Sequence, residues 1–467
     1  MKISPNMAPL VVALGLMTAL PPTGVAQVAQ SDTLDMSLDE AYRFAGLHNP
    51  AYQRTLNDMS LNAASSRTNL LTRVLPRLSL DLLNTGYDGS LTKQGVDEFG
   101  RPVNNPETSY VFSSNTRQMA SLNWSIQGAS LFNSLKRQRL TNDDRRLAED
   151  KGLWDLRSNV RRQFFSAARE AELLRLERDL LAERRVDHDL VSRLFELAQR
   201  TRVDLLNAEL EIEQQGLQIQ TQDGQYQRSL LMLRTTLGDL GLPPIRLTDD
   251  PPPVFDPSGL VAESLVRTAM ERNIGVQQSR ASVTSAAHSV AESKTNWWPN
   301  LNASFSYGRY TQIRGRSALF DLKADDDIQS RMSLQLSFPF FSNYFQNSYD
   351  IQEARVQVDN SNEELRNARL SAEEQVRGNL MTLNSQYETY RLARRSQEIA
   401  DEALRLAREE YRMGTRTFTE LRDSIDQERN AARQVIEARY GFVDALVSLE
   451  EAVGTPVGPS SVTTGGS

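Results

Sequence analysis

Four short stretches of the chain alternate hydrophobic with polar residues, and the long segments between them carry hydrophobic residues at helical spacing. In the first stretch Leu78, Leu80 and Leu82 alternate with polar or charged residues. A period of two is typical of a β-strand, whereas spacing of three and four residues is typical of an amphipathic helix. The polar segments 88–116 and 310–329 are expected to be the loops of two strand hairpins. We therefore predict strands at residues 77–87, 117–127, 300–309 and 331–339.

Two long segments without proline follow the strand pairs, at residues 129–197 and 342–413. Leu173, Leu176 and Leu180 show the helical spacing in the first of them. At about 1.5 Å per residue, each segment forms a rod on the order of 100 Å long. Ordinary globular helices have about 11–12 residues. We therefore predict two coiled-coil-like rods, each followed by a tight turn and a return helix.

The order of short helix, second helix, strand pair and helical hairpin occurs twice along the chain. This repetition predicts an internally duplicated protein with a Pro-rich linker between its halves. Ser37 and Glu40 form a capping box for the first short helix, and Asn49-Pro50 starts the helix after it. The predicted parts are a signal peptide at residues 1–26, a first repeat at 27–242, the linker at 243–257, a second repeat at 258–454 and a disordered tail at 455–467.

The first residues have the pattern of a secretory signal peptide. Lys2 gives a positive start, residues 10–20 form an apolar core, and small residues precede an expected cleavage after Ala26. No later stretch approaches the roughly 20 apolar residues of a transmembrane helix. The exported chain is therefore expected to cross a membrane with strands, if it crosses one.

The composition narrows the function classes. The chain has 467 residues, 24% of them charged, and a net charge of −7, which gives no sign of nucleic-acid binding. It has no cysteine, so thiol catalysis, disulfides and thiolate metal sites are excluded. The sequence also has no nucleophile motif, phosphate loop or metal-ligand cluster, because its three histidines are scattered: His48, His188 and His288. We therefore expect no enzyme activity, no cofactor and no metal.

Each predicted strand has an apolar face and a face of serine, asparagine and glutamine. An ordinary half-buried sheet has the same pattern and remains an alternative. The nearly uncharged polar face, the export signal and the Trp and Phe residues at strand ends favour a membrane β-barrel. The smallest such barrel has about eight strands, so four do not close one, whereas three copies supply about twelve. The predicted fold class is mainly α with a membrane β-barrel to which several chains contribute.

The turn after the second rod, residues 411–424, reads YRMGTRTFTELRDS. Gly414 ends the rod, and Thr417 is predicted to cap the next helix with Glu420 as its capping-box partner. Glu420 and Asp423 are three residues apart and therefore share one helix face. Three residues stand at equivalent places in the first tip: Ala198, Thr201 and Asp204.

This motif resembles the periplasmic tip of the TolC-type outer-membrane efflux protein family, also called outer membrane factors. The segments LDEAYRFAGLHNP, LPRLSL, WPNLNAS and SFPFF support the resemblance, which covers about residues 34–454. It implies a homotrimer whose twelve-stranded barrel lies in outer-membrane lipid above an α-helical tunnel in the periplasm. It also implies passive conduction of drugs or proteins, in efflux or type I secretion, with a periplasmic adaptor (membrane fusion protein) and an inner-membrane pump as partners.

The resemblance further implies roles for individual residues. Glu420 and Asp423 match acidic rings that narrow the tunnel, and rings of carboxylates favour cations. Asp204, Tyr411 and Arg416 match a latch of hydrogen bonds and ion pairs that holds the tip closed. The residues expected to contact the adaptor are those of the two tips: Ala198, Arg200, Thr201, Arg202, Gly414, Thr415 and Thr417.

Alternatives remain at two levels. Without the resemblance, the favoured interpretation is that Glu420 is only a capping residue and Asp423 a solvated helix position. Ala198 stands where the family usually has glycine, which predicts a different first turn. For the whole protein, the alternative is a periplasmic coiled-coil adaptor or scaffold with no membrane-spanning part. An adaptor has one long hairpin, whereas this chain has two, each after a strand pair, which favours the channel.

Overall fold

The computed structural model describes residues 33–93, 99, 101–102, 108–127, 130–314, 328–338 and 343–458. The predicted signal peptide and all but the first four residues of the predicted tail lie outside these residues.

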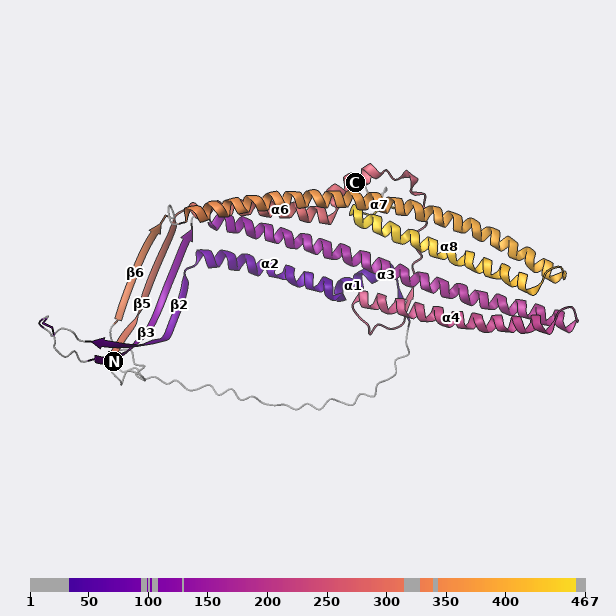
Figure 1. The fold of residues 1–467 in the computed structure, drawn as a ribbon, viewed down its shortest axis with the longest axis horizontal. Coiled ribbons are helices and arrows are strands. Elements are labelled where there is room, and N and C mark those ends of the chain that lie inside the picture. Colours follow the sequence, from indigo (N-terminus) through magenta and orange to yellow (C-terminus); the bar gives the residue numbers. More distant parts are fainter. Residues whose placement is uncertain are drawn as a thin grey trace, which may run out of the picture.

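The described residues form one elongated body, with strands at one end and two helical hairpins reaching to the other (Figure 1). The predicted rods are confirmed, because α3 and α7 contain 67 and 69 residues. Two short 3-10 helices, η1 (Pro257–Gly259) and η2 (Thr295–Trp297), flank α5 and α6. The α-helices are α1 (Leu38–His48), α2 (Pro50–Val74), α3 (Ser130–Glu196), α4 (Arg202–Leu237), α5 (Ala262–Arg272), α6 (Ile274–Lys294), α7 (Tyr344–Arg412) and α8 (Phe418–Val453).

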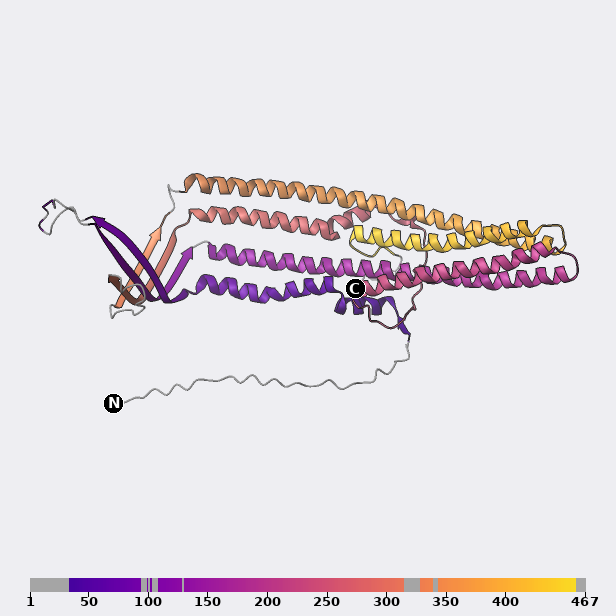
Figure 2. The ribbon, with the colours of Figure 1, turned by 60° about the horizontal axis from the view of Figure 1, so that its bottom comes forward.

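Helices α2, α3, α6 and α7 run side by side from the strands to the middle of the molecule (Figure 2). Beyond the middle, α4 packs on α3 and α8 packs on α7 as the two hairpins. The predicted start signals are confirmed: Ser37 and Glu40 form the capping box of α1, and the Asn49 side chain caps α2. Among the described helices, none is both long and apolar enough to cross a membrane.

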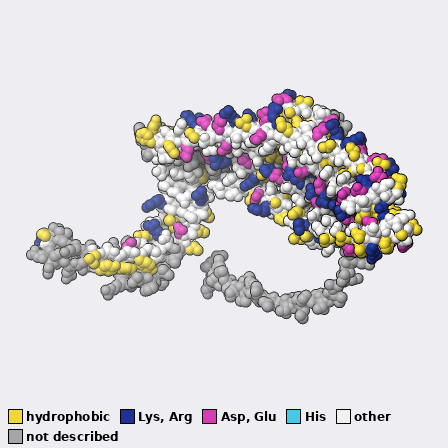
Figure 3. Space-filling view, turned by 45° about the vertical axis from the view of Figure 1, so that its right-hand side comes forward, with side chains coloured by type: hydrophobic (Ala, Val, Ile, Leu, Met, Phe, Trp, Pro, Cys, Tyr) yellow, Lys and Arg dark blue, Asp and Glu magenta, His cyan; other side chains and the backbone are white. Residues whose placement is uncertain are grey.

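The four predicted strands are present, and they form a single sheet in the order β2-β3-β5-β6 with antiparallel neighbours. Its apolar face is uncovered in the single chain: Leu80 on β2 is 64% exposed and Leu334 on β6 is 68% exposed. Figure 3 shows hydrophobic side chains gathered at this strand end of the molecule. The strands are β2 (Arg77–Lys93), β3 (Thr108–Gln127), β5 (Asn300–Arg314) and β6 (Ile328–Ser337).

The predicted loops were too long. Strands β2 and β3 remain paired as far as Lys93 and Thr108, and β5 and β6 also extend into the expected loop. The polar composition of residues 88–116 suggested a loop, but the ladder is made by backbone groups that polar side chains do not interrupt. Polar side chains even pair across it, as in the 2.8 Å hydrogen bond that the Asn115 amide donates to Asp88.

The predicted linker also contains a strand that the sequence did not reveal. Strand β4 (Ile245–Leu247) pairs in parallel with β1 (Leu34–Met36). Arg246 donates two 2.7 Å hydrogen bonds to Asp35, and this contact lowers the pKa of the Asp35 carboxyl. Three residues are too few to show a period of two, so hydrophobic patterning does not detect such strands.

Three clusters of buried side chains lie along the helices. The first packs α1 against α3, α4 and α8, and the second packs α5 against α7 and α8. The third lies at the hairpin tips and joins α3, α4, α7 and α8. Between them, the buried Arg184 of α3 pairs with Glu211 of α4 at 3.2 Å and with Asp426 of α8 at 2.9 Å. The two hairpins therefore form one packed unit rather than two separate arms.

Candidate functional site

The candidate site is the pair of hairpin tips, which lie beside each other at the end farthest from the sheet (Figures 1 and 2). Tyr411 and Leu421 of the second hairpin are fully buried in the same cluster as Val191 and Leu205 of the first. The sequence predicted both tips, and the structure brings them into direct contact.

The two tip turns have the same conformation, contrary to the expectation that Ala198 makes the first one different. Ala198 has a φ of 55° and Gly414 a φ of 80°, both in the left-handed region. In the first tip the Gln199 amide donates to the Leu194 carbonyl at 2.9 Å, and the equivalent bond in the second tip is 3.1 Å. This is the Schellman arrangement that ends helices at a left-handed residue. Alanine is strained there because its Cβ approaches the backbone.

Exchanging the two left-handed residues is expected to have opposite effects. Ala198→Gly should raise the free energy of unfolding by about 1 kcal/mol, since glycine adopts this conformation without strain. Gly414→Ala should lower it by a similar amount, because a Cβ at Gly414 meets no atom within 4 Å and only the backbone strain acts. Thermal unfolding of the two variants against the wild type measures both signs. A loss of stability in Ala198→Gly would contradict the strain at this turn.

Both return helices begin with a capping box. The Glu420 amide donates to the Thr417 hydroxyl at 3.3 Å, and the Thr417 amide donates back to the Glu420 carboxylate at 2.9 Å, which confirms the predicted cap. Thr201 and Asp204 form the same box in the first tip. The hydrogen bonds from Thr417 lower the pKa of Glu420. Glu420 is therefore ionised at the start of α8, and it carries its negative charge while it caps the helix.

Arg200 joins the two tips, a role that the sequence analysis did not assign to it. Its guanidinium donates to the backbone carbonyl of Tyr411 at 2.5 Å and to that of Arg416 at 3.2 Å. The same guanidinium lies 4.0 Å from the centre of the Tyr411 ring. Cations bind aromatic faces at such distances. Arg200 of the first hairpin therefore holds the start of the second tip turn in place.

The predicted latch residues are not paired with one another within one chain. Tyr411 is fully buried, and its hydroxyl has no hydrogen-bond partner among the described residues. Arg416 pairs with Glu410 at 3.2 Å, while the Asp204 carboxylate accepts a hydrogen bond from the Thr201 amide at 3.2 Å. Asp423 is exposed, with its carboxylate 3.7 Å from Arg422. The three latch residues therefore lie on the tips but in separate contacts.

A cluster of carboxyl groups lies behind the tips and was not found from the sequence. Arg408 of α7 donates to Glu183 of α3 at 2.9 Å and to Asp187 at 3.3 Å. Glu428 of α8 lies near Glu183 and Asp401, and one of its oxygens is buried without a hydrogen-bond partner among the described residues. Burial and the two neighbouring carboxylates raise the pKa of Glu428 from 4.5 to about 7. This cluster links three helices and changes charge near neutral pH.

Comparison with known proteins finds similarity to outer membrane efflux proteins. Residues 265–455 match the family model described as Outer membrane efflux protein. The chain is also 24% identical over 213 residues to the outer membrane protein TolC of Escherichia coli (strain K12). The chain is therefore similar to outer membrane efflux proteins over its second half. The resemblance predicted from the tip motif is thereby confirmed, and the predicted outer-membrane location agrees with the names of these relatives.

The TolC match covers 44% of this chain and only 41% of the relative, so the chain spans less than half the length of the relative it matches. Solved structures of outer membrane proteins share the fold more completely. A membrane protein from Pseudomonas aeruginosa has a TM-score of 0.67 at 18% identity, covering 93% of this chain and 94% of that one. The open state of the Neisseria gonorrhoeae MtrE outer membrane channel has a TM-score of 0.64 at 16% identity, covering 90% and 89%. Nearly the whole chain therefore shares the fold of these solved structures.

Proposed function

We propose that this protein is the outer-membrane channel of a tripartite efflux or type I secretion system. The observation that carries the proposal is the four-stranded sheet, which exposes leucines on β2 and β6 in a chain that is similar to outer membrane efflux proteins. The same sheet carries hydroxyl pairs between strands, such as Ser304 with Ser333 at 2.7 Å. One apolar and one polar face suit a barrel wall between lipid and water.

The proposed assembly is a homotrimer. The described sheet leaves one edge of β2 and one edge of β6 without a neighbouring strand, and open sheet edges are not tolerated in lipid. Three copies joined from β6 to β2 supply about twelve strands, within the range of outer-membrane barrels. The helices would then surround a periplasmic tunnel. The halves 27–242 and 258–454, joined by the linker at 243–257, would be duplicated repeats, since both have the same order of elements.

The proposed partners follow from the position of the tips. They lie at the end opposite the strands (Figure 1), where a periplasmic adaptor and an inner-membrane pump would dock. The contacting residues proposed are those of both turns, at 198–202 and 413–417. Transport would be passive and driven by the pump, with no catalytic role for the channel.

The proposal is tested by locating and sizing the protein. Cells that make it are fractionated, and the detergent extract is analysed by electrophoresis without boiling and in planar lipid bilayers. We expect an oligomer of three times the monomer mass in the outer-membrane fraction, and discrete conductance steps. A water-soluble monomer in the periplasm would overturn the proposal in favour of a coiled-coil scaffold.

We propose that Glu420 and Asp423 make the tunnel selective for cations, since threefold symmetry would repeat each carboxylate into a ring. The variant Glu420→Gln/Asp423→Asn is expected to lower the cation-to-anion permeability ratio severalfold and to weaken block by multivalent cations. Glutamine preserves the capping box, so the change isolates charge from helix stability. Glu398→Gln is the control, because Glu398 is an exposed carboxylate on α7 and lies outside the two tip turns. Unchanged selectivity in the double variant would leave Glu420 with its capping role only.

We propose that Asp204, Tyr411 and Arg416 latch neighbouring copies in the closed state. The position of the three residues on the two tips supports this proposal. A partly exposed ion pair contributes only about 0–1 kcal/mol, which suits a contact that must open. Tyr411→Phe combined with Arg416→Ala is expected to raise single-channel conductance in planar bilayers, and Arg412→Ala serves as control. A conductance equal to that of the wild type would refute the latch.

A further inference from the structure

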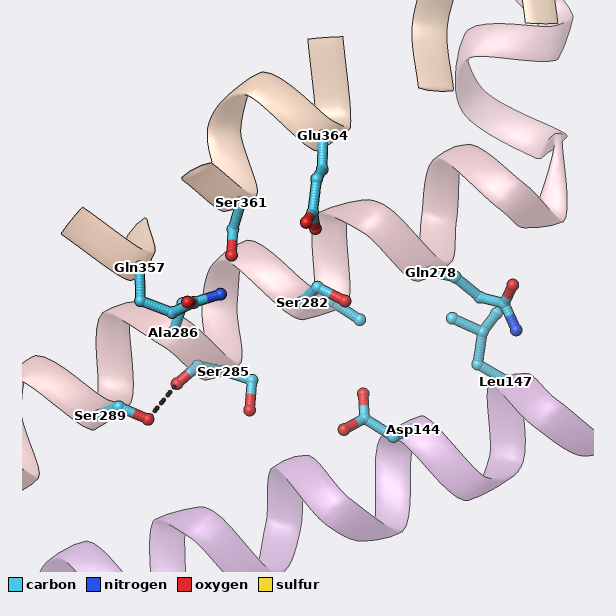
Figure 4. A pocket seen from close by; sticks show the side chains of 11 residues that line it. Asp144, Leu147, Gln278, Ser282, Ser285, Ala286, Ser289, Gln357, Ser361 and Glu364 are labelled. Atoms are coloured by element: carbon cyan, nitrogen blue, oxygen red, sulfur yellow. Dashed lines mark hydrogen bonds between the residues drawn. The ribbon is translucent and has the colours of Figure 1, made fainter. Parts of the chain in front are cut away.

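A groove with a volume of about 580 Å³ lies over one face of α6, between α3 and α7 (Figure 4). The floor of the groove is wide because α6 presents small side chains to it, among them Ser282 and Ser285. Asp144 of α3 and Glu364 of α7 stand on its two sides, and no Lys or Arg lines it. The groove is therefore a negative, polar hollow far from the tips.

The two carboxylates of the groove differ from their immediate neighbours in sequence. Asp143 is within 3.9 Å of Arg146, and Glu363 is within 3.4 Å of Arg366. Asp144 and Glu364 have no ion-pair partner among the described residues. Figure 4 shows Asp144 pointing up from α3 and Glu364 pointing down from α7 into the same space. Two unpaired anions that face one hollow leave a favourable place for positive charge.

Ser361 gives independent evidence that the hollow is a binding site. Its side chain is only 3% exposed, and its hydroxyl points into the groove from α7 (Figure 4). It has no hydrogen-bond partner in the part of the chain that the structure describes. The oxygen of this otherwise buried side chain reaches the open space of the groove. A group that enters the groove can therefore act as its hydrogen-bond partner.

We propose that this groove binds an organic cation with aliphatic amino groups, such as a diamine or a polyamine. Ammonium groups carry several hydrogen-bond donors and no acceptor, which complements the carboxylates of Asp144 and Glu364 and the hydroxyl of Ser361. The volume lies within the roughly 300–1,000 Å³ of sites for small organic ligands and far exceeds that of one bare ion. Among the described residues, no group of three or more His, Asp or Glu side chains is placed to hold a metal ion.

The electrostatics of Asp144 agree with this ligand. Partial desolvation and the neighbouring Asp143 raise the pKa of the Asp144 carboxyl, although the residue remains largely exposed. A cation in the groove would favour the ionised form again. Occupation should therefore strengthen as salt is lowered, because the carboxylates of the groove are open to solvent and are screened by ions.

The test is equilibrium binding of labelled spermidine to the purified full-length protein in detergent at low salt. We expect saturable binding by the wild type, at least a tenfold loss of affinity in Asp144→Asn/Glu364→Gln, and a severalfold loss in Ser361→Ala. The matched control Asp143→Asn/Glu363→Gln removes the same charge beside the groove and should bind like the wild type. Ser282→Leu, which fills the floor, should abolish binding without any change of charge.

Two results would overturn the inference. One is the absence of spermidine binding by the wild type at millimolar concentration. The other is equal losses in the groove pair and the control pair, which would show only general attraction to a negative surface. Because binding is measured without transport, neither result depends on whether the protein conducts.

Discussion

Replacing Arg200 with alanine is expected to loosen the contact between the two hairpin tips and to speed amide hydrogen exchange at residues 411–417 by roughly 100-fold. Arg200 gives two hydrogen bonds to carbonyls of the second tip and covers the Tyr411 ring. Hydrogen bonds from a charged donor contribute about 1.5–3 kcal/mol each when buried, and cation–π contacts about 0.5–1 kcal/mol at exposed sites. Since Arg200 is partly exposed, we expect a total near 3 kcal/mol.

The control for this experiment is Arg202→Ala. The Arg202 guanidinium lies over the ring of Phe195 in its own hairpin, at 6.0 Å, so its loss removes a similar charge without touching the second tip. Arg200→Lys should be intermediate, because an ammonium does not form the planar two-pronged contact. Exchange rates in Arg200→Ala equal to those in Arg202→Ala would show that the bridge contributes nothing to tip contact.

Glu428→Gln is expected to stabilise the protein at pH 8 and to leave its stability unchanged near pH 4. The pKa of Glu428 is raised to about 7 in the folded protein from 4.5. The folded state therefore binds the proton more tightly than the unfolded state. The stabilisation of the folded state that comes from protonated Glu428 is fully present below about pH 4.5 and is lost as pH rises through about 7. After allowance for the part of the side chain that reaches water, the loss is roughly 2 kcal/mol.

Glutamine has the shape of the protonated glutamate but does not ionise, so the variant should lack this loss. The measurement is the difference in melting temperature between variant and wild type at several pH values from 4 to 8. Glu402→Gln is the control, since Glu402 is exposed and paired with Arg405 at 2.8 Å. A difference that does not change with pH would contradict the charge assigned to Glu428 at neutral pH.

The sequence carried enough information for the helices and for the existence of each sheet strand. Rods of 67 and 69 residues have many hydrophobic repeats. Caps such as Ser37 and Thr417 fix the starts of α1 and α8 through local hydrogen bonds. Where the strands end was less clear, because most side chains of residues 88–93, which continue the ladder, are polar. The ladder is made by backbone groups, so a strand that lacks a regular alternation of hydrophobic and polar residues is not detected from the sequence.

The missed features depend on contacts between residues far apart in the chain. Arg200 reaches a carbonyl 211 positions later, and Glu428 acquires its unusual pKa from Glu183 and Asp401 on other helices. A single arginine in a turn or a glutamate on a helix is ordinary in sequence. The family resemblance indicated the two tips as the functional region. The three-dimensional contacts were needed to show that Arg200 is the side chain that joins them.

The order β2-β3-β5-β6 gives each sheet two unlike edges, and in a ring of identical copies every junction then repeats one head-to-tail contact. A copy whose β6 edge is blocked still accepts a neighbour at β2 and is incorporated, but the ring cannot close around it. If the protein is the proposed homotrimer, and defective and normal copies are made in equal amounts and mix at random, only about one assembly in eight is free of the defect. Mutations at either edge would therefore behave as genetically dominant, whereas mutations that merely unfold the chain would be recessive.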